Sequence, residues 1–294
     1  MAFRGVELSQ HHATWPGPPV AVTGATGKVG ALVAAELRAR GSEPRLIVRD
    51  PARLPTPAPD VRVAEFADSR AVEAALRGVR TVLMVSASES PDRRKVHRVF
   101  VDAAARAGVQ HIVYTSFLGA APDAVFTLAR DHFDTEQAIV SSGVAYTFLR
   151  DSLYADFIPG MAVDGRIRGP AAHGRLAPVA RADVARAAAA VLQDPPAHAG
   201  RTYDLTGPAA LTMEEVSVCL SEASGAPVVY EEESIHEAYR SREVFDAPRW
   251  QVEAWVSTYT AIAAGELDVV SDDVRALTGR GPLSLPDVVR RQVT

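Results

Sequence analysis

The sequence predicts an α/β fold in which a doubly wound parallel sheet has helices on both faces and is joined by a smaller, mostly helical C-terminal lobe. Three observations lead to this class. Short apolar runs alternate with amphipathic segments from residue 20 to about residue 150, a glycine-rich turn follows the first run, and the alternation weakens after residue 150. Such alternation predicts parallel strands, because parallel neighbours need crossover connections that are usually helices.

The individual elements follow from apolar periodicity and from the glycines that end each helical segment. Predicted strands cover residues 20–23, 45–48, 61–64, 81–85, 111–114 and 145–149, and predicted helices cover 28–40, 69–77, 92–107 and 124–142. A further helix over 182–192 and a strand over 202–205 are expected to return to the same sheet.

Composition excludes several functional classes. The chain has 294 residues and a net charge of −5, so it lacks the basic surface that nucleic-acid binding requires. No run approaches the roughly 20 apolar residues of a membrane helix. One cysteine cannot form an internal disulfide, which suits a reducing cytoplasm. No spacing typical of metal ligands is present, so we expect no metal site.

The most specific local pattern is the turn Gly24-Ala25-Thr26-Gly27-Lys28-Val29-Gly30. It lies between a predicted strand and a predicted helix, which is the context that a dinucleotide-binding turn requires. Glycine leaves room for close backbone approach, and the helix N-terminus then directs its amides at a pyrophosphate. We therefore predict a Rossmann-like fold whose pyrophosphate ligands are Gly24, Thr26, Gly27, Lys28, Val29 and Gly30.

The choice of cofactor is predicted from the end of the second strand. Arg49 follows this strand and offers a forked guanidinium to a 2′-phosphate, which favours NADP(H), and Arg53 can assist it. Asp50 keeps NAD(H) possible, since a carboxylate accepts hydrogen bonds from ribose hydroxyls. Asp68, after the third strand, either contacts the adenine amine or caps the following helix.

Further ligands are expected where the later strands end, because ligands bind at the carboxyl ends of parallel strands. The fourth strand leads into a small polar segment that should lie beside the cofactor, and the fifth and sixth strands end in polar side chains that should approach the nicotinamide. These residues are Ser86, Ala87, Ser88, Thr115, Ser116, Arg150, Asp151, Ser152 and Tyr154. Tyr154 is also a candidate catalytic residue. Tyr154 and Phe157 can stack on a planar ring, although core packing is the commoner role of such aromatics.

The sequence divides into three parts on this basis. Residues 1–18 are predicted to be an N-terminal arm, because they are polar and interrupted by proline. Residues 19–150 are predicted to form the NAD(P)-binding domain, with 180–206 returning to its sheet. Residues 151–179 and 207–294 are predicted to form the substrate-binding lobe.

Four segments together resemble the NmrA-like atypical short-chain dehydrogenases, and most of all their bacterial NAD(P)H:quinone oxidoreductase members. They are Gly24–Gly30, Val48–Pro51, Ala107–Ser116 and Gly143–Arg150. The resemblance covers about residues 20–290 and is loose after residue 205. It implies a Rossmann core, a preference for NADP(H) and a variable C-terminal lobe.

The sequence departs from the wider superfamily at its catalytic Tyr-x-x-x-Lys pair. By the family pattern, Leu128 stands at the tyrosine position and His132 at the lysine position, while Ser116 matches the catalytic serine. His132 can therefore supply a proton near neutral pH or hold the nicotinamide ribose. A structural histidine on the helix surface or at the edge of the core is an equally good interpretation. Glu136, one turn later, is expected either to orient His132 or to be a structural ion-pair partner.

Three other polar features are interpreted as structural. His97 is expected on a solvated helix face and is only a distant catalytic candidate. Cys219 is expected to be a packed side chain in a helix near 212–224. The run Glu231-Glu232-Glu233 is interpreted as an exposed helix start.

These observations favour an NADPH-dependent reductase that transfers hydride to a quinone or a similar planar electrophile. Hydride addition to a quinone needs an oriented cofactor and only a modest proton source, so the missing pair is tolerable. One alternative is an NAD(P)-binding redox sensor with a regulatory protein partner, which would lack the same pair. Another is a tailoring enzyme for an aromatic natural product. A homodimer is also compatible with the sequence.

Overall fold

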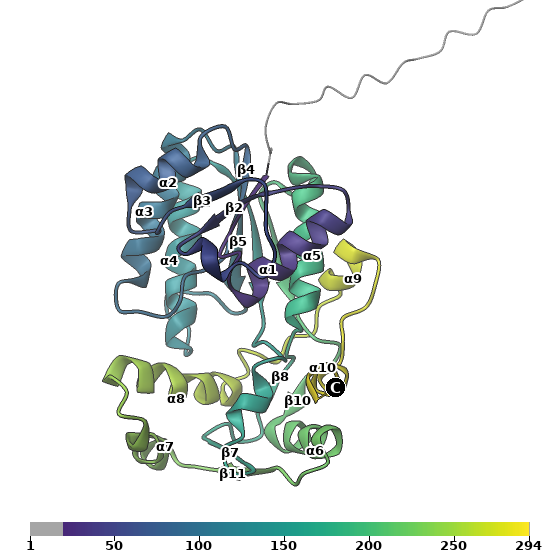
Figure 1. The fold of residues 1–294 in the computed structure, drawn as a ribbon. Helices are drawn as coiled ribbons and strands as arrows, with labels where there is room; N and C mark the ends of the chain where they lie inside the picture. Colours follow the sequence, from purple (N-terminus) through teal and green to yellow (C-terminus); the bar gives the residue numbers. More distant parts are fainter. Residues whose placement is uncertain (1–19, 294) are drawn as a thin grey trace, which may run out of the picture.

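The computed structural model describes residues 20–293, so the predicted arm over 1–18 lies outside the described residues. The described chain forms a layered α/β part and a second group of short elements beyond the carboxyl ends of its strands (Figure 1).

A seven-stranded sheet with parallel pairing throughout forms the centre of the α/β part. Its spatial order is β3-β2-β1-β4-β5-β6-β9, so the order reverses between β1 and β4. The strands are β1 (Val20–Thr23), β2 (Arg45–Val48), β3 (Val61–Val63), β4 (Thr81–Met84), β5 (His111–Phe117), β6 (Ala145–Asp151) and β9 (Arg201–Leu205). The predicted doubly wound fold is confirmed.

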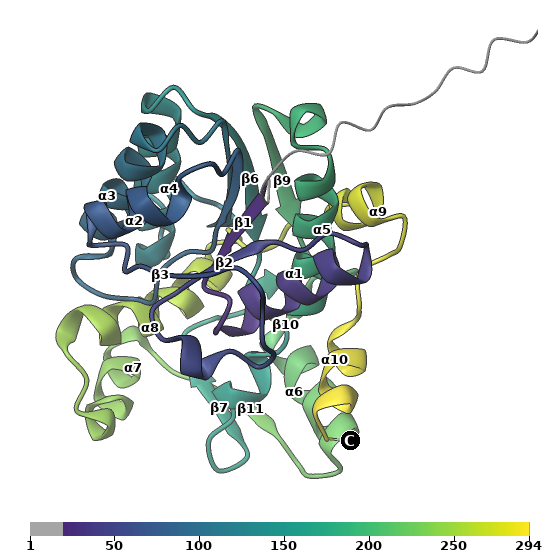
Figure 2. The same cartoon turned by 45° about the horizontal axis from the view of Figure 1, so that its top comes forward.

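Helices cover both faces of the sheet (Figure 2). On one face lie α1 (Lys28–Ala39), α5 (Arg181–Gln193) and α9 (Asp273–Thr278), and on the other lie α2 (Ser69–Leu76), α3 (Arg93–Arg106) and α4 (Thr127–Ser141). Alternate strand residues enter the two cores, because side chains point to opposite faces along a strand. Val22 and Leu149 pack towards α1 and α5, whereas Ala21 and Phe148 pack towards α2 and α3.

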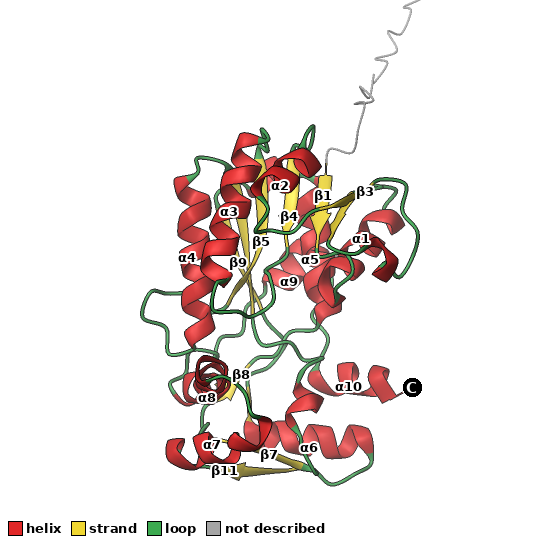
Figure 3. Cartoon of the chain, turned by 60° about the vertical axis from the view of Figure 1, so that its left-hand side comes forward, coloured by secondary structure: helices red, strands yellow, loops and turns green. Residues whose placement is uncertain are grey.

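The C-terminal lobe combines helices with two small sheets (Figure 3). Its helices are α6 (Met213–Ser224), α7 (Ile235–Ser241), α8 (Arg249–Ala263) and α10 (Leu285–Val293). Its strands pair as β7 (Arg166–Gly169) with β11 (Val229–Glu232) and as β8 (Arg175–Leu176) with β10 (Leu211–Thr212). Short 3₁₀ turns lie at η1 (Pro51–Arg53), η2 (Ile158–Met161), η3 (Pro195–His198) and η4 (Glu243–Phe245). A core of its own, built around Ile158, Leu176 and Met213, holds the lobe together.

The lobe differs from the sequence interpretation at the glutamate run. Glu231 and Glu232 lie in strand β11, and only α7 three residues later is helical. Glu231 forms ion pairs with Arg166 and Arg168 on the neighbouring strand β7, and Glu233 is buried against Arg242 at 3.0 Å. The interpretation of this run as an exposed helix start was wrong, because Glu231 and Glu232 lie in a strand and arginines of adjacent elements pair with Glu231 and Glu233.

Helix α9 lies apart from the rest of the predicted lobe. Its Val274 is fully buried in the core between α1, α5 and the sheet, and Leu277 packs against the same core. The chain therefore returns once more to the α/β part within 207–294 before α10 packs on α6.

Candidate functional site

The glycine-rich turn has the geometry that a pyrophosphate site needs. Gly24 has a φ of +63°, and a Cβ on Gly30 would lie 2.4 Å from the carbonyl oxygen of Gly24. Helix α1 begins at Lys28, and no side chain caps its N-terminus. Its first amides are thus available to an anion, and the positive end of the helix dipole favours one. The residues present fit the dinucleotide that the sequence implies.

A buried threonine fixes the two strands at which the sheet order reverses. The hydroxyl of Thr23 donates to the carbonyl of Leu83 at 3.0 Å and accepts from the amide of Val85 at 2.9 Å. The connections after β1 and β4 lead to opposite sides of this point, to β2 and to β5. In such folds ligands bind at the carboxyl ends of the strands where the order reverses.

The two candidates for cofactor choice differ in their availability. Arg49 is exposed at the end of β2 and has no ion pair with a described residue. The Asp50 carboxylate instead accepts from the amide of Ala52 at 3.0 Å and caps the 3₁₀ turn η1. Asp68 caps α2 by accepting from the amide of Ala71 at 3.0 Å, which confirms that part of its prediction.

Buried side chains hold the segment after β4. The amide of Ser86 donates to the hydroxyl of Thr115 at 2.9 Å, so the ends of β4 and β5 are joined. The amide of Ala87 donates to Nε2 of His97 at 2.9 Å, and its carbonyl accepts from Nε of Arg93 at 3.0 Å. Ser88 is exposed beyond this bracing. The loop is therefore tied to the first turns of α3 on both its donor and its acceptor side.

The expectation that His97 lies on a solvated helix face was wrong. His97 is fully buried, and its Nδ1 lies 2.8 Å from the hydroxyl of Thr135 on α4. Burial, followed by the charge of Arg93, lowers the pKa of His97 to about 3. The run of basic residues around it hid this position, because α3 turns Arg93 and His97 inward while Arg94 and Arg98 face Asp134.

His132 lies in a buried hydrogen-bonded chain. Its Nδ1 is 2.9 Å from the hydroxyl of Tyr114, and its Nε2 is 3.0 Å from Nη2 of Arg93. A guanidinium can only donate, so Nε2 accepts and the neutral ring has its proton on Nδ1. Burial and then Arg93 lower the pKa of His132 well below its usual value. The structure therefore contradicts the expectation that His132 titrates near neutral pH.

Glu136 takes the second of its two predicted roles. Its side chain forms no hydrogen bond with His132 but accepts two from Arg150, Nε at 2.9 Å and Nη2 at 2.7 Å. The hydrogen bond to Glu136 raises the pKa of Arg150. The hydroxyl of Ser116 also donates to Glu136, at 2.6 Å. The structure thus brings together Ser116 and Arg150 through a buried carboxylate.

A second buried carboxyl lies at the end of β6. Asp151 is 2% exposed, its Oδ2 accepts from the hydroxyl of Tyr154 at 2.7 Å, and its Oδ1 has no partner among the described residues. The neighbouring hydroxyl of Ser152 is also buried without a partner there. Burial raises the pKa of Asp151 to about 8. Asp151 therefore retains its proton at neutral pH, which its sequence position alone does not indicate.

The ring of Tyr154 already has one neighbour. The guanidinium of Arg181 lies over it, 5.0 Å from the ring centroid. Phe157 is 50% exposed and lies three residues further on. One face of Tyr154 is thus engaged by a cation, which limits the stacking that we expected to its other face.

Sequence reasoning missed Arg93 and Tyr114 as members of the buried chain. Tyr114 is fully buried in the centre of β5 and looks like an apolar core residue in sequence. A usable signal is the spacing of Arg93 and His97, which places them on one face of a helix one turn apart.

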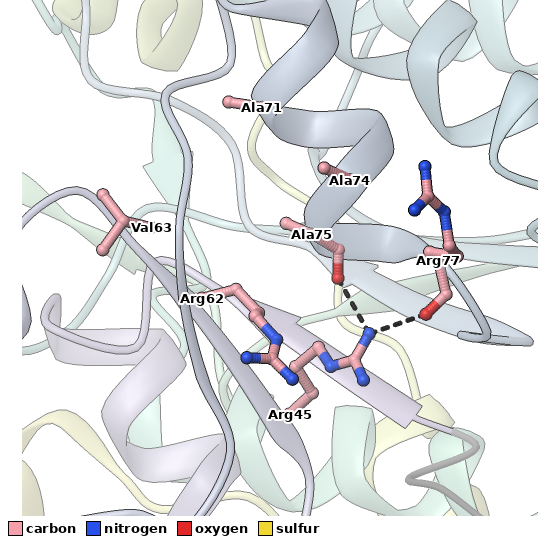
Figure 4. A pocket seen from close by; sticks show the side chains of 7 residues that line it. All are labelled: Arg45, Arg62, Val63, Ala71, Ala74, Ala75 and Arg77. Atoms are coloured by element: carbon pink, nitrogen blue, oxygen red, sulfur yellow. Dashed lines mark hydrogen bonds between the residues drawn. The ribbon is translucent and has the colours of Figure 1, made fainter.

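A hollow elsewhere on the surface is structural. It is lined by Arg45, Arg62, Val63, Ala71, Ala74, Ala75 and Arg77 (Figure 4). Arg45 donates there to the carbonyl oxygens of Ala75 at 2.9 Å and Arg77 at 2.8 Å, and so caps the end of α2.

The described residues hold no group of three or more side chains placed to bind a metal ion. None of their helices is both long and apolar enough to cross a membrane.

Comparison with known proteins places this site in a family. A family described as NAD(P)H-binding matches residues 24–195, which include the turn, the end of β2 and the buried chain around His132. The chain belongs to this NAD(P)H-binding, NmrA-like family and is an NAD(P)H-dependent oxidoreductase.

Individual relatives are similar over most of the chain. Quinone oxidoreductase 2 of Escherichia coli is 37% identical over 221 residues, which cover 72% of this chain and 77% of the relative. The crystal structure of the NADPH-dependent quinone oxidoreductase QOR2 from that organism, complexed with NADPH, matches with a TM-score of 0.84 at 31% identity and covers 94% of this chain and 100% of the other. Triphenylmethane reductase of Citrobacter sp., complexed with NADP(H), matches with a TM-score of 0.82 at 32% identity over 94% and 100%.

Proposed function

We propose that this protein is an NADPH-dependent reductase that transfers hydride to a quinone or a similar planar electrophile. The observation that supports this most directly lies on α4. The position of the superfamily's catalytic tyrosine is Leu128, which is buried, and the lysine position is the neutral His132. A site without that acid suits a substrate whose reduction requires little proton transfer from the enzyme. The relatives named as quinone and triphenylmethane reductases support the same substrate class.

The preference for NADPH over NADH rests on Arg49 and Asp50. The exposed guanidinium of Arg49 is free of ion pairs with described residues and can bind a 2′-phosphate. The carboxylate of Asp50 is occupied by the amide of Ala52, so it is a poorer partner for a ribose hydroxyl. The first amides of α1 would hold the pyrophosphate, with Thr26 and Lys28 beside it. Bound NADPH supplies the hydride.

The remaining predicted ligands lie along the carboxyl ends of the strands. We propose that the segment Ser86–Ser88, with Thr115 behind it, lines the ribose and nicotinamide side of the cofactor. Asp68 would reach the adenine only with a carboxylate oxygen that its cap does not use. Arg150 and Ser116 both bond to Glu136, so their side chains would be held in fixed positions beside the nicotinamide ring.

Tyr154 and Asp151 are the proposed proton source. Hydride addition leaves a negative oxygen on the reduced ring, and this oxygen must take one proton to give the neutral hydroquinone. The hydroxyl of Tyr154 would turn from Asp151 to give that proton to the substrate oxygen. The carboxyl of Asp151, which is protonated at neutral pH, would then donate its own proton to the Tyr154 oxygen across 2.7 Å. One hydride and one proton are consumed for each quinone.

The test is a titration of NADPH and NADH on the wild type and on Arg49→Ala, followed by turnover on a panel of simple quinones. We expect Arg49→Ala to weaken the binding of NADPH by about 10- to 100-fold, which corresponds to the loss of a hydrogen bond to a charged group. The affinity for NADH should change by less than about twofold. The matched control is Arg201→Ala, an exposed arginine at the opposite end of the sheet in β9.

Two results would contradict the proposal separately. Equal weakening of NADH and NADPH by Arg49→Ala would disprove the cofactor preference. Tight NADPH binding without turnover of any quinone would disprove the substrate class and favour the alternative of a redox-sensing binding protein.

A further inference from the structure

Arg93 is a buried cation without a carboxylate partner. It is 5% exposed at the first position of α3, and it forms no ion pair with any described residue. Its hydrogen bonds go to neutral acceptors, Nε to the carbonyl of Ala87 and Nη2 to Nε2 of His132. Arg242, the other arginine buried to a similar degree, is paired with Glu233 at 3.0 Å.

The absence of a counter-ion is unusual on energetic grounds. Removing a cation from water costs several kcal/mol unless an anion compensates it, so buried charges are normally paired. Of the two carboxylates on the facing helix α4, Glu136 pairs with Arg150, and Asp131 pairs with Arg94 at 3.7 Å. The charge of Arg93 lowers the pKa of Asp131 against the larger effect of burial, but Arg93 forms no ion pair with it. A position of this kind is stabilised when a ligand brings a negative charge.

The place of Arg93 in the fold indicates which ligand that is. It directly follows the loop after β4, at the carboxyl edge of the sheet where ligands bind in such folds. It contacts His132, the residue at the position of the superfamily's lysine. A positive charge from α3 thus occupies the neighbourhood that the lysine of α4 would otherwise occupy.

The effect of this charge is visible on the neighbouring oxygens. Burial raises the pKa of both Tyr114 and Tyr154, and the charge of Arg93 opposes that rise at each phenol, together with Arg181 at Tyr154. Tyr154 lies three residues after the end of β6, and Tyr114 lies in β5 beneath α4. An oxygen that becomes negative between these groups would experience the same attraction.

We propose that Arg93 stabilises the negative oxygen that forms on the substrate when hydride adds to it, and that His132 is a positioning residue that holds the guanidinium in place. This inference rests on the proposed function and adds a catalytic residue to it. No proton moves through Arg93 or His132, because the first is a permanent cation here and the second is held neutral. The carbonyl π bond of the substrate opens onto its oxygen, and the proton then comes from Tyr154.

The first experiment compares Arg93→Gln, Arg93→Lys and the control Arg98→Gln, an exposed arginine on the same helix. We expect Arg93→Gln to lower kcat with a quinone about 100-fold, which is typical for the loss of one charge-stabilising donor. The Kd for NADPH should change less than about threefold. Arg93→Lys should recover part of the rate, and Arg98→Gln should leave it unchanged. Thermal unfolding of each variant confirms that it is folded.

The second experiment needs no turnover. The phenolate of 4-nitrophenol is a stable anionic oxygen on a planar ring, and its visible absorbance reports its ionisation. When 4-nitrophenol is titrated into the NADP⁺-saturated protein, we expect it to bind as the phenolate, with a lowered pKa, in the wild type and in Arg98→Gln. In Arg93→Gln its affinity should fall by at least tenfold and its pKa should return towards that of the free phenol.

Specific outcomes would overturn the inference. In the kinetic experiment, these are an unchanged kcat in Arg93→Gln, or an NADPH Kd that rises in this variant by as much as kcat falls. In the phenolate experiment, these are no binding of the phenolate to the wild type, or equal phenolate affinity in the wild type and Arg93→Gln. The failure of the proposed function alone looks different, because phenolate binding would then depend on Arg93 while no quinone is turned over.

Discussion

At the scale of single residues, burial determines the chemistry of this site more than residue type does. His132 would titrate near neutral pH in water, yet it is neutral and an acceptor here. Asp151 would be ionised in water, yet burial keeps its proton in place at neutral pH. Both changes have the same origin, since a low-dielectric environment disfavours whichever form bears the charge.

The raised pKa of Asp151 leads to a prediction about stability. Its carboxyl titrates at about 8 in the folded protein and near 3.9 when unfolded, so between these values the folded state holds one more proton. The free energy of unfolding therefore falls as pH rises across this window. In the wild type this decrease is about 1.4 kcal/mol per pH unit. Asp151→Asn has no ionisable group at this position, so we expect its free energy of unfolding to lack this part of the pH dependence.

Chemical denaturation at pH 5, 6 and 7 measures this slope. The advantage of Asp151→Asn over the wild type should grow steadily with pH, and it should stop growing above about pH 8. The control is Asp123→Asn, an exposed carboxyl before α4, which should leave the slope as it is. A constant difference between Asp151→Asn and wild type at all three pH values would contradict the assignment.

The residue scale is also where sequence reasoning was least complete. Glycines of the turn and the cap at Asp68 are local features, so their roles follow from neighbouring residues and spacing. The chain of Arg93, His132 and Tyr114 joins two helices and a strand that lie far apart in sequence. No local pattern predicts such contacts, because they depend on how α3 and α4 pack.

At the scale of elements, all seven strands of the main sheet were predicted, but two of them, β5 and β6, were predicted to end too early. Strand β5 continues to Phe117 and β6 to Asp151, with Ser116 paired to Arg150 across them. Polar residues at the end of an apolar run resemble the start of a loop. In this fold they remain in the sheet, which is what holds the candidate site residues in fixed positions.

The turn before α1 gives an element-scale prediction. Alanine at position 30 would place its Cβ 2.4 Å from the carbonyl oxygen of Gly24, so the turn must open. We expect Gly30→Ala to cost about 1–3 kcal/mol of stability, as overpacking does, although alanine is otherwise the better helix former. NADPH affinity should fall at least tenfold, since the turn positions the amides of α1.

Urea denaturation and NADPH titration measure the two effects. Gly160→Ala is the matched control, because a Cβ there meets no atom within 4 Å and its φ is not positive. It should leave both the stability and the NADPH Kd close to wild type. Wild-type NADPH affinity in Gly30→Ala would show that the turn does not position the cofactor.

At the scale of the whole molecule, the lobe supports the helix that holds His132 and Glu136. Glu266, after α8, accepts from the amides of Val125 at 2.7 Å and Phe126 at 3.3 Å. These amides precede α4, which has no side-chain cap of its own at Phe126. A residue of the lobe thus caps a helix of the α/β part, and α4 also packs on α8 (Figure 3).

Removal of this cap should loosen the connection between the two parts. We expect Glu266→Ala to lower the free energy of unfolding by about 1–2 kcal/mol, the typical value of a cap, and to lower kcat more than it weakens NADPH. Glu266→Gln keeps an acceptor and should retain most of the stability. Equilibrium denaturation and steady-state kinetics measure both.

The control for this prediction is Glu253→Ala, an exposed glutamate on α8. If Glu253→Ala and Glu266→Ala had equal effects, the loss would reflect the charge of the lobe rather than the cap on α4.

The bracing of Ala87 has a consequence for the entropy of cofactor binding. Glycine-rich and polar loops beside nucleotide sites commonly become ordered only when the ligand arrives, and that ordering subtracts from affinity. In this protein the amide and the carbonyl of Ala87 are both held by buried side chains of the protein's own helix α3. The loop is therefore pre-organised, and its encounter with NADPH resembles the docking of two rigid surfaces more than a mutual folding event.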